Sequence, residues 1–409
     1  MKKSFISKYK YELTFFTVFM YELLLKIPRI DEMVGWRTTQ YVVNYKEYGL
    51  VEMGLIGSIF RMFTDYITPT MVYIFELIGV LLLSVTIAVF LGKMIRNSSE
   101  EIKFAVMMIV LLYVISPLSL TKFFSSRNYG IFDVFLMLIA FWIALLAIRR
   151  KNLWLLIPLS MIALMIHHVF ALTYYMFVFG ALMYYVFENK FEKKTTLFSV
   201  ITVGISVIVT LYFQFFREVS TYTSTEEAVA AAQENSGLLI EYEVLSRLFD
   251  PVDEYINKWS ITGLYGKTMD IFDRSLALLF TLALLSPMVA LFVAVWVKCV
   301  RRSVEKNEKI FYLFCLLSPL FSVVLFISAI DWDRWMMGIL TAQMSFIFFL
   351  IHKKNETFYS VMRDVSSFLQ SHKALCIAYL VFVGLLRCSP IEFSLGDFGK
   401  ELLGYSIKY

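Results

Sequence analysis

Long apolar runs recur along the whole chain, separated by short polar connections. A helix that crosses the hydrocarbon core of a bilayer needs roughly 20 apolar residues. Eleven runs reach or approach that length, and they lie at 12–28, 68–92, 103–120, 129–148, 153–166, 168–187, 195–214, 275–298, 310–330, 332–351 and 373–389. The pattern predicts an all-α, polytopic integral membrane protein with about 11 transmembrane helices, short and uneven in length.

Lysine and arginine mark alternate connections between these runs. Cytoplasmic loops carry an excess of both residues. With the basic N-terminus MKKSFISKYK inside, the loops that contain 149–151, 301–309 and 352–358 also face the cytoplasm. The expected location is therefore the cell (inner) membrane, with a cytoplasmic N-terminus and an outer C-terminus.

The stretch 153–187 decides the topology of everything after it. If it were one long helix, the basic loops RRSVEKNEK and HKKNETF would face outward, against the rule for lysine and arginine. Two short helices that turn at His167–His168 keep both loops inside. We therefore expect a hairpin at this point.

Two of the outer connections are long enough to carry structure of their own. The segment 29–67 contains apolar positions at near-helical spacing around 49–63, as in a helix that lies in the membrane interface. The segment 215–273 combines an alanine-rich stretch with an amphipathic one, which predicts an outer helical lobe or lid. The whole chain, 1–409, is predicted to form one transmembrane domain that includes these two outer segments.

Composition agrees with this organisation. Hydrophobic residues make up 59% of the chain and charged residues 17%, against about 45–50% and about 25% in soluble domains. The net charge of +5 is divided among short clusters that mark topology, so nucleic acid is not an expected partner. The four cysteines have no paired spacing, which argues against a disulfide or a cysteine metal site.

Three carboxylates fall inside the predicted spans, at Glu22, Glu76 and Asp133. Ionisable groups are costly there, so they usually face the bundle interior and serve function. The topology places all three in the outer halves of their helices. Either they hold helices together, or they contribute to a site near the outer surface.

The turn SAIDWDRWMMG at 328–338 carries the densest chemistry. Asp331 and Asp333 can bind hydroxyls or accept a proton, Arg334 can bind a phosphate, and Trp332 and Trp335 can stack on a sugar. In the alternative interpretation, the tryptophans are interfacial anchors and Asp333 pairs with Arg334.

Three other outer positions supply candidate residues. Arg127 lies six residues before Asp133, either as its ion-pair partner or as a phosphate ligand that Asp133 orients. His167 and His168 suit a proton shuttle or a phosphate contact. No metal site is expected, because adjacent side chains diverge and the other histidines, at 352 and 372, are predicted to be cytoplasmic.

Asp31 and Glu32 directly follow the first apolar run. A carboxylate at this place can act as a general base for an acceptor hydroxyl. Alternatively, both are acidic residues in contact with water.

Many uneven spans with polar residues on the outer side resemble GT-C-type glycosyltransferases and the Wzy-type O-antigen and capsular polysaccharide polymerases. The first family typically has an acidic catalytic residue in the first outer loop before an interfacial helix, the place that Asp31 or Glu32 occupies ahead of 49–63. The polymerases typically depend on arginines in outer loops, a part that Arg127, Arg334 and either Arg217 or Arg247 could play. The Asp-x-Asp at Asp331–Asp333 comes late in the chain rather than in the first outer loop.

The resemblance implies an exofacial transferase or polymerase that takes sugar units from a polyprenyl-phosphate or polyprenyl-diphosphate donor during envelope or capsule glycan synthesis. The expected catalytic residues are Asp31, Glu32, Asp331 and His167, and the expected substrate-binding residues are Arg127, Asp133, His168, Trp332, Asp333, Arg334 and Trp335. Its partners would be the lipid-linked sugar, membrane lipid and other glycan-assembly membrane proteins. No cofactor is expected, and a divalent metal, though compatible with the chemistry, is not indicated.

Two other functions fit the same features. A lipid-linked sugar flippase or transporter would need polar residues through the full membrane depth. A membrane O-acyltransferase acting on glycans would use the paired histidines as its base and leave the carboxylates secondary.

Overall fold

The computed structural model describes residues 5–125, 127–150, 152–216, 218–219, 221–250, 254, 269–328 and 331–385. This part of the chain is helical, with no strand and one isolated bridge between Ile67 and Ser236. The all-α class expected from the apolar runs is therefore confirmed.

Within these ranges, five continuous helical stretches are long and apolar enough to cross a membrane. Two bent helix pairs raise the number to as many as seven if each pair forms one span, with bends of 66° and 88°. The five are α6 (Pro69–Asn97), α7 (Glu100–Ile115) with η3 (Leu120–Phe124), α11 (Lys193–Leu211) with η6 (Tyr212–Phe216), α18 (Lys306–Leu317) with η8 (Ser318–Ser322) and α19 (Val323–Ser328), and α20 (Trp332–Lys353). The bent pairs are α16 (Met269–Leu284) with α17 (Ser286–Arg302), and α21 (Glu356–Ser371) with α22 (Lys373–Leu385).

The predicted count of about 11 spans is not confirmed, because several apolar helices are short. α2 (Lys10–Lys26) and α8 (Asp133–Arg149) have 17 residues each. α9 (Leu156–Ile166) has 11 residues and α10 (Tyr175–Glu188) has 14. At 1.5 Å per residue, a 17-residue helix is about 26 Å long, which is less than the roughly 30 Å of a hydrocarbon core.

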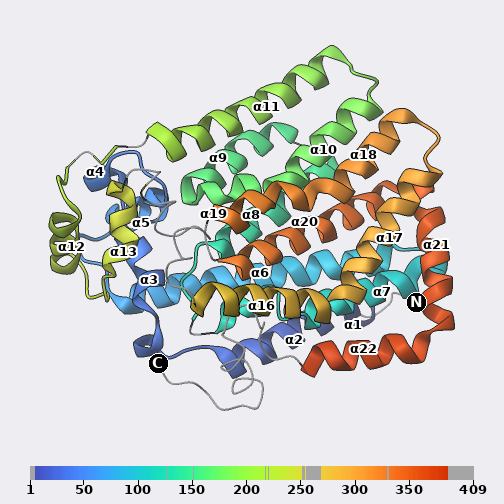
Figure 1. Cartoon of the computed structure of the whole chain (residues 1–409), viewed down its shortest axis with the longest axis horizontal. Helices are drawn as coiled ribbons and strands as arrows, with labels where there is room; N and C mark the ends of the chain where they lie inside the picture. The colour runs from blue at the N-terminus through green and yellow to red at the C-terminus, as the bar shows by residue number, and fades with distance from the viewer. Residues whose placement is uncertain are drawn as a thin grey trace.

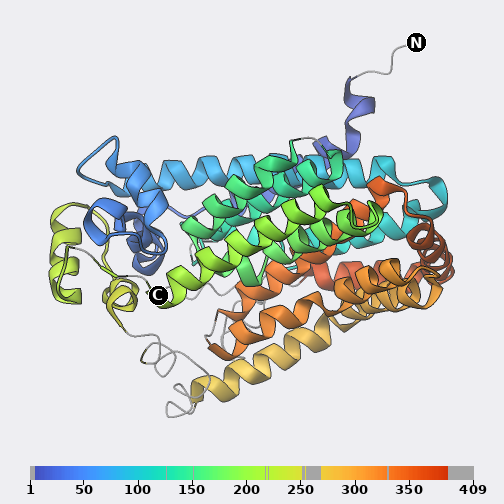
Figure 2. The ribbon, with the colours of Figure 1, turned by 90° about the horizontal axis from the view of Figure 1, so that it is seen from above.

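The long helices run side by side along the longest axis of the molecule (Figure 1). α20 lies among α6, α8 and α10, and most of its side chains are buried. A helix that is apolar on all sides belongs in such a position. α11 lies at the periphery and exposes Val200 and Ile208, as expected of side chains that face lipid (Figure 2).

The stretch 153–187 forms two helices, as the distribution of basic residues predicted. α9 ends at Ile166, and α10 begins at Tyr175 after η5 (His168–Leu172). Glu188, at the end of α10, forms ion pairs with Arg150 after α8 and with Lys353 at the end of α20. These contacts return α10 to the end of the bundle from which α9 started.

A group of short helices covers one end of the bundle, opposite α21 (Figure 1). We call residues 30–67 and 221–250 the helical cap. Its two parts are joined by hydrogen bonds: the Ile67 N–H donates to the carbonyl of Asn235 at 3.2 Å, and the Gly237 N–H donates to the carbonyl of Ile67 at 3.0 Å. The cap contains η1 (Ile30–Glu32), α3 (Gly35–Thr38), η2 (Thr39–Val42), α4 (Tyr45–Tyr48), α5 (Gly54–Arg61), α12 (Thr225–Glu234) and α13 (Tyr242–Phe249). The remaining short elements are α1 (Phe5–Lys8) and η4 (Leu153–Leu155).

The helix expected around 49–63 is α5, and it begins at Gly54. The preceding residue, Met53, has a left-handed backbone with φ 63° and forms the N-cap at which α5 starts. Gly57 allows α5 to pack directly on η2, because a Cβ at this position would lie 1.9 Å from the carbonyl oxygen of Val43. Gly57 therefore allows two elements within the cap to approach closely.

Candidate functional site

Arg334 is a buried charge beneath the cap that pairs with two carboxylates. Its Nε and Nη2 donate to Oδ2 of Asp133 at 3.1 and 2.5 Å, and its Nη1 donates to Oδ2 of Asp331 at 2.6 Å. The side chains of Arg334 and Asp133 are 7% and 2% exposed. Asp133 opens α8 and Asp331 directly precedes α20, so this pairing ties two helix N-termini together. Carboxylates at helix N-termini are also stabilised by the helix dipole.

Asp331 combines this anchoring with access to solvent, since its side chain is 31% exposed. Burial alone would raise the pKa of Asp331, but Arg334 and then Arg37 outweigh it and hold the pKa of this carboxyl below its usual range. Asp331 is therefore an ionised carboxylate at neutral pH, with one oxygen occupied by Arg334.

Asp333 does not pair with Arg334, in contrast to the alternative drawn from the sequence. It pairs instead with Lys122 of η3, whose side chain is 1% exposed. In an α-helix, adjacent residues point to different sides, so Asp333 and Arg334 reach different neighbours. This second ion pair ties η3 to the start of α20.

Arg37 of α3 brings a second buried guanidinium to the site, since the residue is only 6% exposed. Its Nε donates to the backbone carbonyl of Arg127 at 3.4 Å, and the guanidinium lies 4.4 Å from the ring centre of Trp36. Within the described ranges, its two terminal nitrogens have no hydrogen-bond partner. Burial lowers the pKa of Arg37 to about 10, Asp331 opposes that shift, and Arg334 adds to it. The group is still charged at neutral pH.

Glu76 of α6 lies directly below the cap and is fully buried. The hydroxyl of Tyr41 donates to its Oε2 at 2.8 Å, and the backbone of Gly130 also hydrogen-bonds to this carboxyl. Glu22, by contrast, pairs with Lys26 at 2.7 Å, and its side chain is 31% exposed. Of the three carboxylates singled out in the spans, Glu76 and Asp133 therefore contribute to this end of the bundle.

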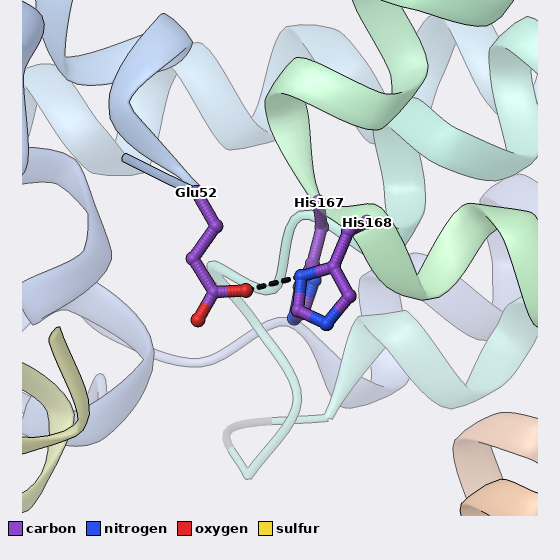
Figure 3. Close-up of side chains that lie close together, drawn as sticks. All are labelled: Glu52, His167 and His168. Atoms are coloured by element: carbon purple, nitrogen blue, oxygen red, sulfur yellow. Dashed lines mark ion pairs between the residues drawn. The ribbon is translucent and has the colours of Figure 1, made fainter. Parts of the chain in front are cut away.

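Glu52, His167 and His168 form a compact group at the junction of cap and bundle (Figure 3). Glu52 comes from the link between α4 and α5, and its carboxylate pairs with Nδ1 of His168. The two imidazole rings lie side by side with their centres 5.2 Å apart. One potential ligand atom from each of the three residues lies within 4.8 Å of the others.

The prediction that the adjacent side chains of His167 and His168 point away from each other is wrong. His167 has an extended backbone at the end of α9, with φ −162° and ψ 124°, and η5 starts at His168. This abrupt change of backbone brings the rings together. Burial lowers the pKa of His167 well below its usual value, His168 adds to that shift, and Glu52 opposes it. The His167 ring is therefore neutral.

The two residue groups are close enough for their charges to interact. Arg334 acts on His167, and Arg247 of α13 acts on both His167 and Asp331. The structure thus brings six predicted site residues to one region: Arg127, Asp133, His167, His168, Asp331 and Arg334.

Other predicted site residues lie elsewhere or face inward. Asp31 and Glu32 have side chains that are 73% and 45% exposed, and both pair locally with Arg29. Trp332 and Trp335 are 5% and 3% exposed and pack on Phe326 at ring-centre distances of 6.3 and 5.3 Å. Their rings fill the interior rather than offering a free face to a sugar. Arg217 lies outside the described residues.

Sequence reasoning did not select Arg37, Lys122 or Glu52. Each lies in a segment predicted to be outside the membrane, where a charged residue is ordinarily solvated. In the structure all three are buried: Arg37 and Glu52 lie in the cap, and Lys122 lies in η3, which packs on α2 and α6. Whether these charged side chains are buried depends on contacts between distant segments, which the local sequence pattern does not encode.

No protein-family model, curated protein or solved structure matches this chain.

Proposed function

We propose that this protein is a glycosyltransferase or polysaccharide polymerase that uses a polyprenyl-phosphate or polyprenyl-diphosphate sugar at the outer face of the cell membrane. The observation that carries the proposal is the buried Arg37, whose terminal nitrogens have no partner in the described part of the chain. These two nitrogens can therefore donate to a ligand without breaking a hydrogen bond within the described residues. The planar fork of a guanidinium matches the oxygens of a phosphate.

Arg334 supports the same assignment by a different route. Asp133 and Asp331 fix its position, so the charge beside Arg37 is held in place before a ligand arrives. Preorganised charges of this kind stabilise developing negative charge without reorganisation during the reaction. In this proposal, Arg37 binds the phosphate directly, and Arg334 shapes the field around it.

Asp331 is the carboxylate best placed to activate the acceptor. It is ionised and partly exposed, and it lies close enough to Arg37 for their charges to interact. The acceptor hydroxyl oxygen would attack the sugar carbon that bears the phosphate. As that bond forms, the bond from carbon to phosphate oxygen breaks, the hydroxyl proton passes to Asp331, and the lipid phosphate leaves with its negative charge facing Arg37.

One buried polar group deeper in the bundle, the amide of Gln343, supports an enzyme rather than a flippase. Gln343 of α20 donates to the carbonyl of Cys315 and to Ser318, both at 3.0 Å, and accepts from the indole of Trp296 at 2.5 Å. Its amide is thus satisfied by the protein itself. A transport path through the membrane would instead call for polar groups that face the substrate at this depth.

The proposal can be tested by complementing cells that lack the gene with the wild-type chain, Arg37→Ala or Arg37→Gln. Surface glycan is measured on gels, and lipid-linked intermediates are measured by mass spectrometry. We expect both variants to lose the glycan and to accumulate the lipid-linked donor at normal protein levels. Arg29→Ala is the matched control, because Arg29 is exposed and pairs only locally with Asp31 and Glu32 among the described residues.

The side on which the donor accumulates separates the two mechanisms. A transferase that has lost activity leaves the donor in the outer leaflet, where added lectin reaches it in spheroplasts. A defective flippase leaves it in the inner leaflet. Normal glycan in both Arg37 variants, or accumulation in the inner leaflet, would refute the proposal.

A further inference from the structure

We propose that Glu52, His167 and His168 bind one divalent transition-metal ion, with Zn²⁺ as the best fit. Each residue offers one ligand atom, and the three atoms lie within 4.8 Å of one another (Figure 3). This proposal does not depend on glycosyl transfer, because the metal content of the purified protein tests it directly.

The donor set favours zinc over the hard cations. Two imidazole nitrogens and one carboxylate oxygen are a recurrent set at zinc sites that keep a fourth position open. Mg²⁺ and Ca²⁺ prefer ligand sets made of oxygen. Tetrahedral ligands at about 2.0–2.2 Å from zinc lie about 3.4 Å apart. The longest separation of the three atoms, up to 4.8 Å, exceeds this spacing, whereas the ion-paired Glu52 and His168 lie closer than it. Binding an ion would therefore draw some of the ligand atoms together and move Glu52 and His168 slightly apart, by small rotations about their side-chain bonds.

The positions of the three residues in the chain suit a closed site. Glu52 and His167 are 4% and 7% exposed, and the side chain of His168 is 19% exposed. Glu52 belongs to the cap, whereas the histidines end α9 and begin η5 in the bundle. A bound ion would therefore hold the cap against the bundle beside the proposed phosphate site.

The surrounding charges favour one kind of fourth ligand over another. Arg247 and Arg334 both act on His167 and disfavour an additional cation. Asp133 and Asp331 neutralise Arg334. Glu52 supplies the negative charge inside the triad, and the adjacent Arg247 favours an anionic fourth ligand such as hydroxide or a phosphate oxygen.

The test uses the full-length chain, purified in detergent, stripped with a chelator and exchanged against Zn²⁺. Metal content is measured by mass spectrometry and affinity by competition with a chromophoric chelator. We expect one equivalent of Zn²⁺ per chain. Glu52→Gln and His167→Asn should each weaken binding by at least about 10–100-fold, the range that even outer-shell changes cause at metal sites. Zn²⁺ should raise the unfolding temperature of the wild-type chain but not of these variants.

The double variant His352→Ala/His372→Ala is the control, because it removes the two histidines outside the triad. It should bind Zn²⁺ as the wild type does. Glu52→Gln can keep a hydrogen bond to His168, so it separates loss of the ion from loss of the local structure. Monodisperse elution and a normal metal-free unfolding temperature verify that each variant is folded.

Absence of a stoichiometric ion in the wild-type chain would overturn the proposal and leave Glu52–His168 as a plain ion pair. Equal Zn²⁺ binding by wild type and triad variants would overturn it as well, by placing the ion elsewhere. Neither result bears on Arg37, so failure of the metal site and failure of glycosyl transfer are distinguishable.

Discussion

Arg334 and Asp133 are 201 residues apart in sequence, yet two guanidinium nitrogens of Arg334 donate to one carboxylate oxygen of Asp133. The pair joins the N-termini of α8 and α20 beneath the cap. Buried ion pairs contribute modestly to net stability when both partners are present, but removal of one partner leaves an uncompensated buried charge. The pair is therefore most informative when its members are removed separately and together.

Asp133→Ala should destabilise the protein by about 3–5 kcal/mol, because Arg334 then retains only Asp331 as an anionic partner. The double variant Asp133→Ala/Arg334→Met should recover much of that loss, since it removes both members of the buried pair and leaves Asp331 partly exposed and near Arg37. Thermal unfolding in detergent measures both effects. Additive losses in the double variant would contradict the pairing.

Gly57→Ala should destabilise the protein by about 1–3 kcal/mol, the usual range for overpacking. The added methyl would lie 1.9 Å from the carbonyl oxygen of Val43, so α5 would have to move away from η2. Gly204→Ala in α11 is the matched control, because its methyl meets nothing within 4 Å. The two unfolding temperatures should differ in favour of Gly204→Ala; equal values would show that α5 docks loosely.

The sequence was a good guide to features that depend on local pattern. The apolar runs predicted the helical class, and the basic loops predicted the α9–α10 hairpin at His167. The location of Glu52 depends on how α5 packs on η2, a contact between backbones that no periodicity reports. Likewise, the partner of Asp333 is Lys122, over 200 residues away, and the adjacent Arg334 was the only partner visible locally.

Arg37→Lys should narrow the pH range of donor-dependent activity on its alkaline side. Arg37 has a pKa of about 10, so it loses its charge as the pH rises through 10. A lysine starts from about 10.4, and a comparable burial effect would bring its pKa to about 8. Because the folded pKa of Arg37 is below the unfolded one, its charge costs stability below pH 10, and this cost falls as the pH rises further.

A pH profile of glycan transfer in isolated membranes checks this prediction. The alkaline limb should move down in Arg37→Lys and stay in place in Arg29→Lys, whose side chain is exposed. If activity falls at the same alkaline pH in the wild type, Arg37→Lys and Arg29→Lys, then Arg37 does not contact the ionised substrate.

Asp331→Asn should reduce the rate of transfer by about 10²–10⁴-fold, the usual contribution of a general base. The amide can still accept a hydrogen bond from Arg334, so the loss would reflect the missing proton acceptor rather than a collapsed site. Asp31→Asn and Glu32→Gln should change the rate little, because both side chains are exposed and are paired with Arg29. Initial rates in membranes with equal protein content decide between these positions. A large loss in Asp31→Asn with a normal rate in Asp331→Asn would instead place the general base in the segment that follows the first helix.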